Sequence, residues 1–140
     1  MQTQSGLVMA ALLVAALAGC GAHDSHGPGG SAPHDAVMLN DVSVASVLGA
    51  ITKANLPVHN ARDTTSSRCP EAGCMEATDT DTVSILKFPS TGRAELYAAA
   101  VRDMLQVEDI VVVYAPTMTG EQKAAYGQVV KTAMLTPANP

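Results

Sequence analysis

The most constraining feature of this sequence is a continuous run of four β-branched residues, Ile110-Val111-Val112-Val113. Side chains branched at Cβ favour the extended backbone, and an unbroken apolar run is typical of a strand that is covered on both faces or lies at the centre of its sheet. We therefore expect the segment 106–114 to form the central strand of a sheet, which Pro116 ends.

Apolar residues that recur at three- and four-residue steps predict a helix ahead of this strand. The helix is expected from Asp41 to about Ala54, with Asp41 or Ser43 accepting hydrogen bonds from its first free amides. Asn55 is expected in the left-handed conformation that ends many helices, and Pro57 prevents continuation. The apolar face of this helix comprises Val44, Val47, Leu48 and Ile51.

Two further helices are predicted later in the chain. Ser90 or Thr91 is placed to cap one of them. Its predicted apolar face comprises Leu96, Tyr97, Ala100 and Val101. Thr119 and Gln122 have the spacing of a capping box and predict the start of the last helix. Gly127 interrupts that helix at a cost of about 1 kcal/mol relative to alanine, so we expect it to make a close contact with a neighbouring element.

Two short segments, Met75–Thr80 and Val83–Phe88, predict a β-hairpin. In the second segment apolar residues recur at every second position, as in a strand with one buried face. Between the first helix and this hairpin, the polar stretch from Pro57 to Gly73 is interpreted as a long loop. The order is therefore helix, strand, strand, helix, strand, helix. It predicts a small α+β domain of two layers, with a short sheet of about three strands.

The N-terminal part of the chain has the character of an export signal. The apolar run from Leu7 to Ala18 suits a signal peptide and is too short to cross a bilayer of about 30 Å as a helix. At its end, Leu17-Ala18-Gly19-Cys20 resembles the lipobox of bacterial lipoproteins. The resemblance implies that a diacylglyceryl anchor, with fatty acids such as palmitate, joins the Cys20 sulfur, and that residues 1–19 are removed. No Lys or Arg precedes the apolar run, which departs from the usual signal pattern.

On this interpretation, residues 20–40 form a flexible tether, residues 41–136 a single domain and residues 137–140 a tail. The protein is then expected at the extracytoplasmic face of the cell membrane. The tether offers an alternative role as a loose copper or zinc site, built from His23, His26, His34, Asp24 and Asp35. Such a set of ligands binds weakly without supporting structure, so we expect no metal or cofactor.

Cys69 and Cys74 remain as a pair in a compartment that permits disulfides. They enclose Pro70-Glu71-Ala72-Gly73, and we expect a disulfide bond across a rigid turn. The alternative, a zinc or redox pair, lacks a second Cys/His pair and the C-x-x-C spacing.

Polar side chains crowd into the predicted loop. The candidate ligand-binding residues are His59, Arg62, Asp63 and Arg68, of which the arginines are suited to an anionic group. His59, Asp63, Ser66 and Ser67 also supply the residue types of a hydrolase triad. They lie on one segment without a Gly-x-Ser-x-Gly nucleophile elbow, so we name no catalytic residue.

Composition narrows the functional classes. The formal charge is -5 and no basic stripe is present, which disfavours a role with nucleic acid.

The segment from Asn55 to Tyr114 is similar to small secreted lipoproteins of actinobacteria, to which no activity is assigned. The similarity rests on Leu-Pro-Val-His-Asn-Ala-Arg-Asp, Cys-Pro-Glu-Ala-Gly-Cys and Lys-Phe-Pro-Ser-Thr-Gly-Arg-Ala. We expect a lipid-anchored, non-catalytic binding or interaction module of the cell envelope that has an envelope protein as partner. An envelope hydrolase and a metal or small-ligand carrier are the alternatives.

Overall fold

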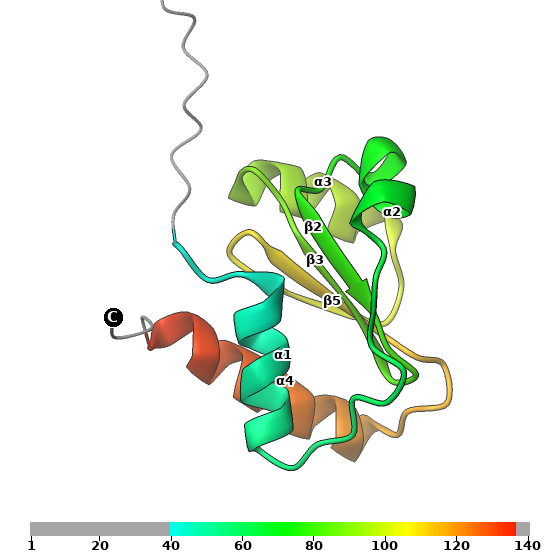
Figure 1. The fold of residues 1–140 in the computed structure, drawn as a ribbon, viewed down its shortest axis with the longest axis vertical. Helices are drawn as coiled ribbons and strands as arrows, with labels where there is room; N and C mark the ends of the chain where they lie inside the picture. The colour runs from blue at the N-terminus through cyan, green and yellow to red at the C-terminus, as the bar shows by residue number, and fades with distance from the viewer. Residues whose placement is uncertain (1–39, 137–140) are drawn as a thin grey trace, which may run out of the picture. The chain divides into compact units, whose positions relative to one another are not determined.

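The structure, a computed structural model, describes residues 40–136 (Figure 1). The predicted signal, the lipobox, most of the tether and the tail lie outside the described residues. Within 40–136 the chain forms four helices and five strands. In chain order they are α1 (Val44–Lys53), β1 (Arg62–Asp63), α2 (Thr65–Ala72), β2 (Glu76–Asp79), β3 (Val83–Lys87), α3 (Thr91–Ala100), β4 (Met104–Val107), β5 (Ile110–Tyr114) and α4 (Gly120–Leu135).

The strands form one sheet in the order β1-β2-β3-β5-β4, and every neighbouring pair is antiparallel. Because β3 and β4 both pair antiparallel with β5, they run parallel to each other on its two sides, and α3 connects them. The α+β class is confirmed, whereas the predicted sheet of about three strands and the predicted order helix, strand, strand, helix, strand, helix are wrong. The segment predicted as one central strand is the hairpin of β4 and β5, which turns at Glu108 and Asp109 and places Glu108 at a φ of 52°.

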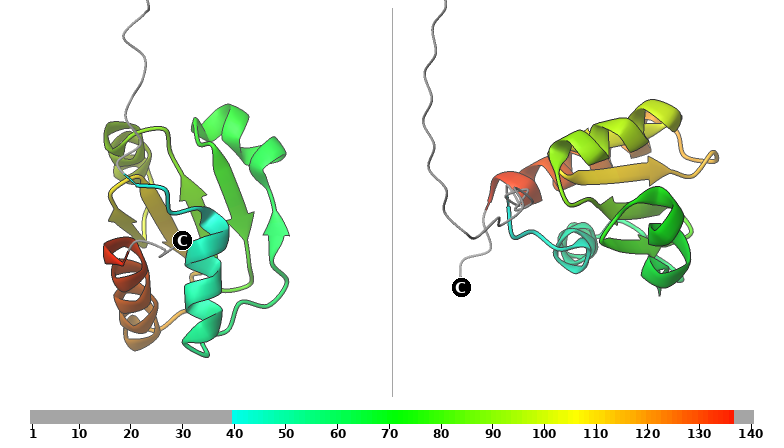
Figure 2. Two further views of the ribbon diagram at one scale, coloured as in Figure 1. Left: turned by 60° about the vertical axis from the view of Figure 1, so that its left-hand side comes forward. Right: turned by 90° about the horizontal axis from the view of Figure 1, so that it is seen from above.

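Both faces of the sheet are covered by helices, so the domain has three layers rather than the two that were predicted. In the register of β3 and β5, Ile85 lies opposite Val112 and Leu86 lies opposite Val111. Successive residues of a strand point to opposite faces, and these two pairs belong to separate buried clusters. α1 and α4 contribute to the cluster of Ile85, and α2 and α3 to that of Leu86. Figure 2 shows α1 and α3 on opposite sides of the strands.

The predicted caps of α1 and the predicted start of α4 are confirmed, although α1 begins at Val44 and not at Asp41. The Ser43 hydroxyl accepts a hydrogen bond from the amide of Ser46, and Asn55 has a left-handed φ of 58°. Thr119 and Gln122 form both hydrogen bonds of a capping box. The predicted close contact of Gly127 is also present: an added Cβ would lie 3.3 Å from the Tyr114 hydroxyl and 3.4 Å from a methyl carbon of Leu105.

The predicted long loop is wrong, because its second half forms the edge strand β1 and the helix α2. Four consecutive Thr and Ser residues and an internal Pro70 give this segment a low helix propensity. Tertiary contacts decide its conformation instead: Cys69 is buried against the sheet, and the Asp63 carboxylate accepts a hydrogen bond from the amide of Thr65. Gly73 ends the helix in the left-handed region at a φ of 76°.

The predicted apolar face of α3 is wrong in part. Its buried residues are Ala94 and Ala98, whereas Leu96 is 70% exposed. Tyr97, which was included in the predicted face, is partly buried and packs against the cluster of Leu86. Alanines four residues apart let the helix approach the sheet closely. The N-cap at Ser90 is confirmed.

The predicted disulfide joins Cys69 and Cys74, at the C-terminal end of α2, with their Cα atoms 4.5 Å apart. In the chain-entropy account, closing so short a loop stabilises the folded state by about 1–3 kcal/mol. We therefore expect reductant to lower the melting temperature modestly without abolishing folding, as measured by circular dichroism. The Cys69→Ser, Cys74→Ser double variant is the control, because reductant has nothing to cleave there. An equal response of both proteins would contradict a structural bridge.

Candidate functional site

A groove of about 550 Å³ lies between α2 and α3, on the face of the sheet that carries the cluster of Leu86. This volume is within the range of sites for small ligands. The groove is lined by Ser67, Arg68, Glu71, Ala72, Arg93, Leu96, Tyr97 and Ala100. Charged, aromatic and small apolar side chains therefore meet in one concave surface.

Helical spacing explains why these side chains converge. Arg93, Tyr97 and Ala100 follow one another at steps of four and three residues, so they share one face of α3. On α2 the same steps bring Arg68, Glu71 and Ala72 to one face. The two faces then form the opposite walls of the groove.

Tyr97 is held in place from beneath by Phe88. The two ring centroids are 5.1 Å apart and the ring planes are inclined by 38°. Phe88 follows β3 directly and is fully buried, and its amide donates a hydrogen bond of 2.8 Å to the carbonyl of Asp109. The aromatic part of the groove is thus fixed to the sheet.

The charges of the groove are only partly neutralised. Arg68 Nε lies 3.5 Å from a carboxylate oxygen of Asp79 on β2. Among residues 40–136, Arg93 and Glu71 take part in no ion pair. The groove therefore presents one uncompensated guanidinium group on the α3 wall and one uncompensated carboxylate on the α2 wall.

Of the four candidate ligand-binding residues predicted from the sequence, Arg68 lines this groove and the other three do not. His59 precedes β1 in an exposed turn, where its carbonyl accepts a hydrogen bond from the amide of Asp81. Arg62 and Asp63 form β1 at the edge of the sheet and are exposed. The structure therefore separates the predicted set.

Asp63 accepts a hydrogen bond at the start of α2, a structural role that the sequence did not indicate. Hydrogen bonds from the backbone amide and the side chain of Thr65 lower the pKa of the Asp63 carboxyl below its ordinary value. Within the described residues, no hydrogen bond joins His59 to Asp63, Ser66 or Ser67. Burial raises the pKa of the Tyr114 hydroxyl at the end of β5.

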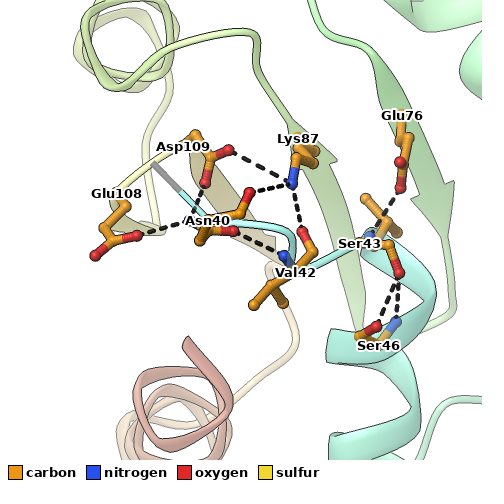
Figure 3. A network of polar contacts seen from close by, with 9 residues as sticks. Asn40, Val42, Ser43, Ser46, Glu76, Lys87, Glu108 and Asp109 are labelled. Carbon is orange, nitrogen blue, oxygen red and sulfur yellow. Dashed lines mark hydrogen bonds and ion pairs between the residues drawn. The ribbon is translucent and has the colours of Figure 1, made fainter. Parts of the chain in front are cut away.

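A second polar feature lies on the opposite face of the sheet and holds the start of the described chain (Figure 3). Lys87 Nζ donates hydrogen bonds to the carbonyl oxygens of Val42 at 2.6 Å and Asn40 at 3.3 Å, and lies 3.6 Å from Asp109 Oδ2. Asn40 Nδ2 donates to Asp109 Oδ1 at 2.7 Å and to Glu108 Oε2 at 2.6 Å. We call these five residues the N-terminal clasp.

Burial distinguishes the clasp from a surface ion pair. The side chains of Lys87 and Asp109 are 3% and 1% exposed. Asp109 Oδ2 accepts no hydrogen bond from the described residues, so its interaction with Lys87 is what compensates its burial. Next to the clasp, Glu76 Oε2 accepts a hydrogen bond of 2.9 Å from the amide of Val44 at the start of α1.

Sequence reasoning missed both the clasp and most of the groove. The signals for the clasp were Lys87 at the end of an apolar strand and Asp109 directly before the β-branched run. Only the register of β3 with β5, which pairs Lys87 with Ile110, brings these opposite charges together. For the groove, Arg93 and Tyr97 are one helical turn apart on α3, but the sequence predicts a loop where the structure forms the opposite wall, α2.

None of the helices among residues 40–136 is long and apolar enough to cross a membrane. In the same part of the chain, His, Cys, Asp and Glu side chains form no group of three or more that could hold a metal ion. No protein-family model, curated protein or solved structure matches the chain, so the groove and the clasp are interpreted from their own geometry.

Proposed function

We propose that the protein is a lipid-anchored binding module of the cell envelope and that the groove between α2 and α3 is its binding surface. The observation that carries the proposal is the composition of this groove: two guanidinium groups, one carboxylate, a buttressed aromatic ring and apolar side chains line one concavity of about 550 Å³. Sites for small ligands combine an apolar surface with a few directed polar groups in this way.

The rest of the chain suits a module that works at a distance from a membrane. In the proposal, the lipid on Cys20 provides the anchor at the extracytoplasmic face. The 20 residues that lead from Cys20 to Asn40 span at most about 70 Å when fully extended. The N-terminal clasp then fixes the end of this tether to the sheet, on the face opposite the groove. A ligand in the groove therefore does not meet the clasp.

The anchor is tested by mass spectrometry of the protein from its native host. We expect a mature chain that begins at Cys20 and carries diacylglyceryl and fatty acyl groups. The Cys20→Ser variant is expected to fold and to take up no fatty acid during metabolic labelling, because the residue lies before every described element. A labelled variant, or a native chain that begins at Met1 without lipid, would contradict this part of the proposal.

The binding surface is tested with a library of small aromatic and aliphatic fragments added to isotope-labelled protein. We expect changes in the amide resonances to concentrate on α2 and α3, with Ser67, Ala72, Tyr97 and Ala100 among them. The apolar groove between α1 and α4, which Ala50, Ala54, Val129 and Ala133 line in part, is the internal comparison. Fragments that bind there and leave α2 and α3 unchanged would overturn the assignment of the binding surface.

A further inference from the structure

We propose that the groove between α2 and α3 binds a small ligand with one carboxylate attached to a flat apolar body. This inference rests on the proposed function and adds the chemical class of the ligand. Three features carry it: the two guanidinium groups, the fixed tyrosine ring and the single carboxylate of the groove.

The two arginines provide the recognition of the anionic group. Arg93 takes part in no ion pair among residues 40–136. Arg68 approaches Asp79 through Nε, so the pair leaves its two terminal nitrogens to donate elsewhere. A planar guanidinium group matches the two oxygens of a carboxylate, and Arg68 and Arg93 offer one such group from each wall of the groove.

The remainder of the groove suits an apolar body. Phe88 contacts the Tyr97 ring and holds it at the groove. Ala72 and Ala100 are small, so they leave space beside this ring. Leu96 stands at the groove with 70% of its area exposed, so a ligand that covered it would remove apolar surface from water. Aromatic rings stack favourably in offset or tilted arrangements, which favours a flat body.

The charges of the groove favour a singly charged anion over a dianion. Arg68 and Arg93 contribute two positive charges, and Glu71 and the Asp79 partner of Arg68 contribute two negative charges, so the surroundings are close to neutral. Among residues 40–136, Arg93 takes part in no ion pair, so its guanidinium group can compensate one carboxylate. A phosphate dianion would leave a second negative charge uncompensated close to Glu71.

The experiment compares benzoate with benzamide, which has the same size and ring but no charge. Both are titrated into the labelled protein while the resonances of the groove are followed. We expect benzoate to bind several-fold more tightly than benzamide. The Arg93→Gln variant should weaken benzoate about fivefold, the effect of losing one charge contact at a partly exposed site, and leave benzamide unchanged. Arg102→Gln is the matched control, because Arg102 is exposed and lies outside the groove.

Each outcome separates the inference from the proposed function. Equal binding of benzoate and benzamide in the groove would overturn the carboxylate class and leave the binding surface standing. An Arg102→Gln variant that weakens benzoate as much as Arg93→Gln would show attraction by overall charge, which overturns the clamp. If neither compound nor any fragment perturbs α2 and α3, the proposed function itself is overturned.

Discussion

The Lys87→Met variant is expected to lose about 3–5 kcal/mol of the free energy of unfolding, the usual cost of removing one partner from a buried ion pair. Methionine fills a similar volume but leaves Asp109, 1% exposed, without its counter-ion. The carbonyl oxygens of Val42 and Asn40 also lose their donor. Small domains are stable by about 5–15 kcal/mol, so this one change should bring the protein close to its limit of stability. Urea unfolding followed by circular dichroism measures the loss.

Two further variants separate the buried pair from side effects of the substitution. Lys131→Met removes an exposed lysine of α4 and is expected to change stability by less than about 0.5 kcal/mol. Lys87→Met combined with Asp109→Leu removes both charges and should recover much of the loss, since well-packed apolar residues often replace a buried pair at little cost. Hydrogen exchange at Val44 and Val47 should quicken in the single variant. If Lys87→Met lost less than about 1 kcal/mol of the free energy of unfolding, the Lys87–Asp109 pair would not be what holds the start of the described chain to the sheet.

The sequence was sufficient to predict elements whose stability is encoded locally. The capping box of Thr119 and Gln122 and the left-handed Asn55 need only their own neighbours, and both are present. The β-branched run from Ile110 to Val113 correctly indicated a strand covered on both faces. The turn at Glu108 and Asp109 lacked the Asn-Gly or Asp-Gly signal of a tight hairpin, which is why one strand was predicted in place of two.

What could not be predicted depends on contacts between distant segments. α2 has poor intrinsic propensity and forms because its end is tied by a disulfide and Cys69 packs against the sheet. The groove requires that α2 exist and that α3 bury Ala94 and Ala98, so that Tyr97 is turned towards α2. Because the sequence predicts a loop in place of α2, it cannot predict the wall of the groove that α2 forms. Arg68 was named as a candidate for its charge alone.

The Phe88→Ala variant is expected to lose about 3–5 kcal/mol, the range for truncating a buried phenylalanine that the surrounding core cannot replace. Phe88 is fully buried on the face of the sheet opposite the N-terminal clasp. Unlike the loss of Lys87, the loss of Phe88 should also change the groove, because the Phe88 ring supports Tyr97 there. We therefore expect benzoate binding to weaken in Phe88→Ala at temperatures where the variant is folded, whereas Lys87→Met should leave it unchanged under the same conditions.

Two controls make this contrast decisive. Phe88→Leu retains much of the apolar volume and should lose less stability than Phe88→Ala, about 1–2 kcal/mol, while still removing the ring beneath Tyr97. Leu135→Ala removes a side chain that is 79% exposed and lies outside the groove, and it should change stability by less than about 0.5 kcal/mol and leave benzoate binding unchanged. Weaker benzoate binding in both Phe88 variants, in spite of their different stabilities, would show that the ring itself positions the groove. Unchanged resonances of Tyr97 in Phe88→Leu would instead show that α3 holds the tyrosine without support from the sheet.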